Sequence, residues 1–99
     1  MNYNDRINQI YDRIGELGQQ LVKYVEEEKI LDRKLGQNIY KVNSVQAENI
    51  NKFIESMKWH INEFNYYTEF YPNKEKVWEF QIKNVNSLLN FINEMKLEG

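Results

Sequence analysis

The sequence predicts an all-α fold, an elongated antiparallel three-helix bundle whose helices meet along coiled-coil-like seams. Over most of the 99 residues, apolar side chains recur at alternating spacings of four and three, which places them on one face of a helix. The rhythm breaks only briefly, near Gly36 and near Pro72, so successive helices should be antiparallel neighbours. We therefore expect one helical domain over residues 1–99, with helices at about 4–34, 44–70 and 74–97.

The first helix is predicted from the longest apolar seam, which only Glu28 interrupts. A helix over 4–34 would be roughly 45 Å long, which implies an elongated molecule. Gly36 after Lys34 is typical of a helix C-terminus, so the helix should end there. The apolar members of the seam are Tyr3, Ile7, Ile10, Ile14, Leu17, Leu21, Tyr24, Leu31 and Leu35.

A second row on the same helix contains Tyr11, Gly15, Gly18 and Val22. Glycine inside a helix costs about 1 kcal/mol relative to alanine. Either another backbone approaches this row closely, or the helix is locally weak. Tyr11, Gly15 and Gly18 are therefore candidate contact residues.

Two further seams predict the second and third helices. Residues 36–43 break the heptad phase and are expected to form the connection, and Asn43 with Gln46 resembles a capping box, with Ser44 as a competing cap. Between the two seams, Pro72 should end one helix and Asn73 can cap the next. The seams are Ile50, Ile54, Met57, Ile61, Phe64, Thr68 and Tyr71, then Trp78, Ile82, Val85, Leu89 and Ile92.

An alternative α+β fold stays open, because two aromatic segments also alternate as strands would. They cover residues 64–71 and 77–82, so a hairpin at 64–82 could turn around Pro72 and Asn73. The spacing of four and three continues through both segments, which favours helices.

Composition narrows the classes of function. The chain has no cysteine, 13 basic and 15 acidic residues and a net charge of -2, so nucleic acid is a disfavoured partner. No stretch approaches the roughly 20 apolar residues of a bilayer span. We expect a cytoplasmic protein without membrane contact. An Asn- and Lys-rich, Ala-poor composition is typical of AT-rich coding genomes, which suggests a bacterial, phage or mobile-element origin.

Catalytic and cofactor motifs are not evident, and no motif identifies a family. His60 is the only histidine, and the run Glu26, Glu27 and Glu28 points in three directions on a helix. There is no glycine-rich phosphate loop. We expect no enzyme, no metal, no cofactor and no small-molecule substrate.

Aromatic residues outside the seams are the feature that points to a partner. Trp59, Tyr66 and Phe70 share a line on the second helix facing away from its seam, and Phe80 and Phe91 share a face of the third. Large rings concentrate binding energy at interfaces. The alternative is that the second helix packs between both neighbours and needs two apolar faces. We expect an interaction module that is an oligomeric adaptor or a stoichiometric inhibitor of a larger partner, with a nucleic-acid-associated regulator as the alternative.

Overall fold

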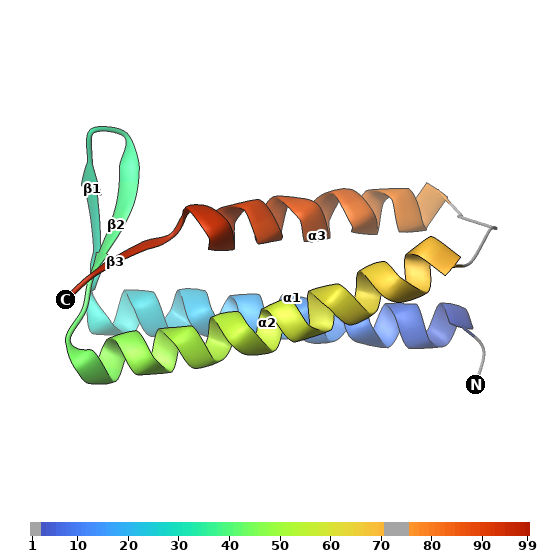
Figure 1. The fold of residues 1–99 in the computed structure, drawn as a ribbon, viewed down its shortest axis with the longest axis horizontal. Coiled ribbons are helices and arrows are strands. Elements are labelled where there is room, and N and C mark those ends of the chain that lie inside the picture. Colours follow the sequence, from blue (N-terminus) through green and yellow to red (C-terminus); the bar gives the residue numbers. More distant parts are fainter. Residues whose placement is uncertain (1–2, 71–75) are drawn as a thin grey trace.

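The computed structural model describes residues 3–70 and 76–99. α1 and α2 lie side by side, α3 runs along them, and a β-hairpin stands out at the end of the molecule where α1 ends (Figure 1). The molecule is elongated, with extents of 44 × 27 × 18 Å. In chain order the elements are α1 (Tyr3–Glu28), β1 (Leu31–Lys34), β2 (Gln37–Lys41), α2 (Ser44–Phe70), α3 (Lys76–Glu94) and β3 (Lys96–Glu98).

The all-α prediction is wrong, because the chain also forms a three-stranded mixed sheet with the strand order β1-β2-β3. The α+β class fits better, but its hairpin lies at residues 31–41 and not at 64–82. Residues 64–70 and 76–82 belong to α2 and α3. The turn expected at Pro72 and Asn73, and the start of the third helix at 74, lie outside the described residues.

α1 ends at Glu28, six residues before the expected end at 34. Lys29 adopts a positive φ of 52°, its N–H donates to Glu26 O at 3.3 Å, and the N–H of Ile30 donates to Val25 O at 3.4 Å. These two bonds form a Schellman motif, and the buried pair Val25 and Ile30 supplies its apolar contact. Glycine usually occupies the position of Lys29, so no residue of the sequence signals this helix end.

The early end of α1 removes two residues from its predicted seam. Leu31 and Leu35 belong to the hairpin and are exposed. Glu28 is also exposed, and its carboxylate accepts a hydrogen bond from Gln46 Nε2 at 3.0 Å. It is therefore not a charge within an apolar seam.

Residues 36–43, expected to be a connection, contain all of β2. Leu35 and Gly36 form a two-residue turn in which both φ angles are positive, as in the type I′ turns that close hairpins. Tyr40 and Val42 are buried and anchor the hairpin to the helices. The hairpin thus rests on the core at its base while its tip projects from the helices (Figure 1).

The third helix ends at Glu94 and not at 97, because Lys96–Glu98 form β3. β3 pairs in parallel with β2, and Leu97 lies opposite Tyr40. The N–H of Val42 extends this pairing by donating to Glu98 O at 2.7 Å. Residues 96–98 are extended because they pair with β2, which is more than fifty residues away in the sequence.

The core forms where the three helical seams meet. α2 spans the expected range 44–70, and the capping box is confirmed: Gln46 N donates to Asn43 Oδ1 at 2.8 Å, and Asn43 N donates to Gln46 Oε1 at 3.0 Å. Antiparallel packing of α1 and α2 joins Arg6 to Glu63 through an ion pair of 2.6 Å. The buried side chains of the helices are Ile7, Ile10, Ile14, Leu17, Leu21, Val25, Ile50, Met57, Ile61, Phe64, Thr68, Trp78, Gln81, Val85 and Ile92.

Among the described residues, no helix has both the length and the apolar character needed to cross a membrane.

Candidate functional site

Three exposed aromatic rings follow one line along α2, and we call Trp59, Tyr66 and Phe70 the α2 aromatic stripe. Their exposed fractions are 61%, 60% and 63%. Intervals of seven and four residues keep them on one side of the helix, opposite the buried Met57 and Phe64. The rings of Tyr66 and Phe70 lie 4.9 Å apart, so they form a continuous apolar surface.

The exposure of these rings decides whether the second apolar face of α2 is a free surface or is packed between both neighbouring helices. If α2 were packed between both neighbours, its second apolar face would be covered. Among the described residues, α1 and α3 instead leave the α2 aromatic stripe open. Trp59 has local support, because its indole meets the His60 ring edge-on at 4.9 Å.

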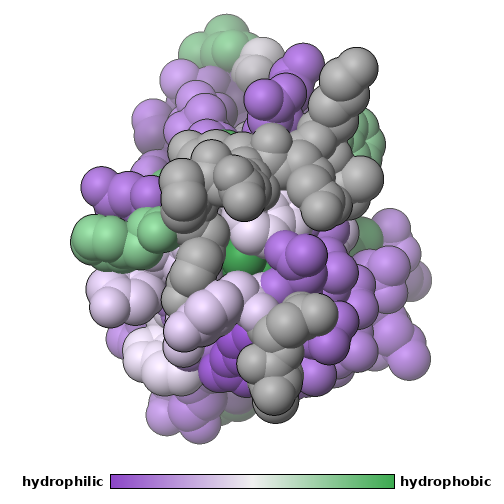
Figure 2. All heavy atoms as spheres, turned by 90° about the vertical axis from the view of Figure 1, so that its right-hand side faces the viewer, coloured by the Kyte–Doolittle hydropathy of each residue, from purple (hydrophilic) through white to green (hydrophobic). Residues whose placement is uncertain are grey.

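Phe80 and Phe91 were expected to act together, but their environments differ. Phe80 is 64% exposed, whereas Phe91 is partly buried and packs against the core. Seen from the end of the molecule where α2 ends and α3 begins, the hydrophobic residues form separate patches among hydrophilic ones (Figure 2). Phe80 is therefore accessible, and Phe91 is largely a packing residue.

The second row of α1 faces α3 across a groove. The hydroxyl of Tyr11 accepts a hydrogen bond from Asn84 Nδ2 at 3.0 Å. A Cβ on Gly15 would meet no atom within 4 Å, and one on Gly18 would meet only Leu88 Cδ2 at 4.0 Å. A cavity of about 480 Å³ adjoins both glycines. No described backbone outside α1 therefore needs these glycines for close approach.

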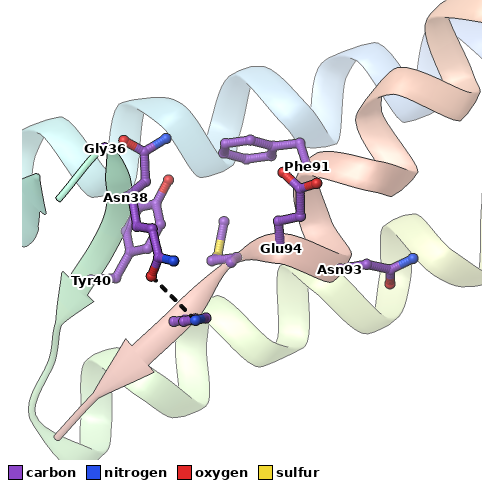
Figure 3. Close-up of a pocket in the computed structure, with 9 residues that line it drawn as sticks. Gly36, Asn38, Tyr40, Phe91, Asn93 and Glu94 are labelled. Carbon is purple, nitrogen blue, oxygen red and sulfur yellow. Dashed lines mark hydrogen bonds between the residues drawn. The ribbon is translucent and has the colours of Figure 1, made fainter. Parts of the chain in front are cut away.

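A second cavity, of about 520 Å³, separates the hairpin from the C-terminal end of α3. Asn38 and Tyr40 border it from β2, while Phe91 and Glu94 border it from α3 (Figure 3). Lys96 and Gln37 also line the cavity, and Lys96 Nζ donates to Gln37 Oε1 at 3.2 Å, the hydrogen bond drawn as a dashed line in Figure 3.

Tyr40 is the most buried residue of this cavity, with 3% of its surface exposed. Burial raises the pKa of its hydroxyl above the usual 10.0, and the positive charge of Arg33 partly opposes that shift. Because the sequence assigned residues 36–43 to a connection, it did not predict this site. The β-branched and aromatic residues Ile39, Tyr40 and Val42 were the available signal.

The hairpin carries a local positive charge, although the net charge of the whole chain is -2. Lys29, Arg33, Lys34 and Lys41 lie within thirteen residues that contain one acid, Asp32. The Asp32 carboxylate lies 3.3 Å from Lys41 Nζ and 3.9 Å from Lys34 Nζ. Its hydrogen bond with Lys41 raises the pKa of that ammonium group.

Metal-ligating groups do not gather in the described part of the chain. Within it, no cluster of three His, Cys, Asp or Glu residues is placed to hold a metal ion. His60 Nδ1 is buried without a hydrogen-bond partner among the described residues. The described surfaces thus offer exposed rings, cavities and local charge.

Comparison with known proteins yields no match: no family model, no curated protein and no solved structure shows significant similarity to this chain.

Proposed function

We propose that the protein is a non-catalytic protein-binding module, either an oligomeric adaptor or a stoichiometric modulator of a larger partner. The α2 aromatic stripe is its contact surface. The observation that supports this most strongly is the exposure of Trp59, Tyr66 and Phe70 in one line, each by about three-fifths of its surface.

Such a surface can supply binding free energy. Three rings with most of their area exposed present roughly 300 Å² of largely apolar surface, the size of functional patches on small proteins. At about 25 cal/mol per Å², its complete burial would contribute on the order of 7 kcal/mol before the costs of association. The stripe is therefore large enough to dominate a modest interface.

Polar residues flank the stripe, as they do in many protein interfaces. Glu55 and Asn62 are exposed on one side, and Glu63 lies on the other, where its carboxylate pairs with Arg6. An aromatic centre with a polar rim excludes water from the rings while keeping the free protein soluble. The partner surface should therefore be an apolar groove with polar edges.

The stripe can be tested by site-specific photo-crosslinking in the native host. A photoreactive phenylalanine analogue replaces Tyr66 in one variant and Glu69, which is exposed on α2 beside the stripe, in the control. We expect a discrete product, with a partner or with a second copy, from position 66 only. Equal products from both positions, or none from position 66, would refute the proposed surface.

Alanine variants then separate binding from folding. With the probe at position 66, Trp59→Ala and Phe70→Ala should each reduce product formation at least tenfold, because hot-spot truncation costs more than about 1.4 kcal/mol. Their melting temperatures should stay within about 3 °C of the wild-type value, since exposed side chains contribute little to stability. A large fall in melting temperature with unchanged product would assign both rings to folding.

A further inference from the structure

The outer edge of the sheet has unused backbone hydrogen-bonding groups. Lys41 N donates to Ile30 O at 2.8 Å, so these two residues form a hydrogen-bonded pair. Such pairs alternate along an antiparallel ladder, which assigns Asp32 with Ile39 and Lys34 with Gln37 to the same class. The N–H and C=O groups of Leu31 and Arg33 therefore point away from β2.

No described segment covers that edge. β1 is the terminal strand of the sheet, and within the described residues no backbone hydrogen bond joins Leu31 or Arg33 to a segment other than β2. Open edges attract another strand unless charge, proline or a bulge protects them. β1 contains no proline, and its charged side chains disfavour strands of like charge, so the edge remains open to a strand of opposite charge.

Those side chains favour an anionic partner. Arg33 and Lys34 lie on the edge strand, and Lys29 and Lys41 lie next to it. The only acid of the hairpin, Asp32, is already shared by Lys34 and Lys41. No described carboxylate forms an ion pair with Arg33, so an incoming strand would meet a net positive edge.

We propose that β1 accepts an extended acidic segment of a partner protein as an additional strand. Main-chain hydrogen bonds from Leu31 and Arg33 would give affinity, and side-chain positions would give specificity. Leu31 and Arg33 project on the same face of the strand, two residues apart. The incoming segment should therefore place an apolar residue beside Leu31 and an acid beside Arg33.

This site goes beyond the α2 aromatic stripe and does not depend on it. The hairpin lies at one end of the molecule, and α2 ends with Phe70 at the other (Figure 1). Each surface can be tested while the other is unchanged. A protein that uses both would connect two partners along its 44 Å axis, as an adaptor does.

Titration of the ¹⁵N-labelled full chain tests the proposal. The probe is a capped heptapeptide, Glu-Val-Thr-Glu-Thr-Val-Glu, in which each valine is two residues from the central glutamate and therefore shares its face. The control carries lysine instead of glutamate. With the glutamate peptide we expect the amide resonances of Leu31 and Arg33 to shift and their hydrogen exchange to slow. Amides of Asp32 and Lys34 are bonded within the hairpin and should change less.

Two substitutions at Arg33 separate charge from hydrogen bonding. Arg33→Ala keeps the outward N–H and should weaken binding about threefold to fivefold, the value of an exposed ion pair. Arg33→Pro also removes that N–H, which the pairing with β2 does not use, and should abolish detectable binding. Unchanged α2 resonances serve as the folding control. If the proline variant loses the hairpin, the hydrogen-exchange measurement on the wild-type chain still decides whether β1 binds the glutamate peptide.

Several results with the peptides would overturn the proposal: equal binding of the lysine peptide, shifts confined to other elements, no shift at all, or protection of Leu31 and Arg33 that rises with protein concentration alone. The last would identify a second copy of this chain as the occupant. Larger hairpin shifts with a short DNA duplex than with the glutamate peptide would also overturn it, because they would indicate a surface for polyanions in general.

Discussion

Leu35 and Gly36 close the hairpin as two successive residues in the left-handed region, with φ angles of 53° and 76°. Glycine adopts this conformation without cost, whereas a leucine side chain there crowds its own backbone. Leu35 is fully exposed, so no packing compensates for that strain. The hairpin therefore forms in spite of its turn, and the burial of Tyr40 and Val42 at its base stabilises it.

Replacing Leu35 with asparagine should stabilise the protein. Asparagine tolerates the left-handed conformation, and Asn-Gly is the favoured pair in type I′ turns. We expect a gain of about 1 kcal/mol, or roughly 4–8 °C in melting temperature, by thermal denaturation. Leu35→Ala, which keeps the conformational penalty, is the control and should not stabilise. A lower melting temperature for Leu35→Asn would show that the leucine makes a favourable contact.

Alanine at Gly15 or Gly18 should also stabilise the isolated protein. A Cβ at either position has room in the structure, and alanine favours the helix by about 1 kcal/mol. Chemical denaturation of each single variant and of the double variant measures the gain, which should be nearly additive. If Gly18→Ala destabilises while Gly15→Ala stabilises, the contact with Leu88 is tighter than its 4.0 Å distance indicates.

Tyr40 should make stability fall at alkaline pH. Burial raises the pKa of its hydroxyl in the folded state above 10.0, so the unfolded chain ionises first and stability is lost as pH rises above about 10. Tyr40→Phe should match the wild type near pH 7, because the hydroxyl forms no hydrogen bond with a described residue, and should lose less stability above pH 10. Melting temperatures from pH 7 to 11 measure this difference. Parallel curves would contradict the assignment.

The ion pair between Arg6 and Glu63 should contribute more than the exposed pair between Arg13 and Glu16. The Glu63 side chain is 17% exposed and lies 2.6 Å from the guanidinium, whereas Arg13 and Glu16 are 47% and 60% exposed. Double-mutant cycles to alanine should give a coupling of about 1 kcal/mol for the first pair and under about 0.5 kcal/mol for the second. Equal couplings would mean that partial burial of Glu63 does not strengthen the interaction.

Sequence alone determined which face of each helix is apolar, because the 3.6-residue repeat can be read from residues close together in the chain. The spacing of four and three identified Ile50, Met57, Ile61 and Phe64 as one face of α2, and all four are buried. The same phase predicted an outward line through Trp59, Tyr66 and Phe70, and these rings are exposed. The capping box of Asn43 and Gln46 was equally visible, because its two bonds join residues three apart.

Tertiary structure decided where the helices stop and where the sheet forms. Lys29 ends α1 without a glycine, because the contact between Ile30 and Val25 in the core stabilises its left-handed backbone. Lys96–Glu98 form a strand only because β2 lies beside them. The end of α1 and the formation of β3 both depend on contacts between residues whose spacing in the sequence does not follow the helical repeat. The apolar rhythm therefore revealed the helix faces, while the open edge at Leu31 and Arg33 emerged only once the hairpin had formed.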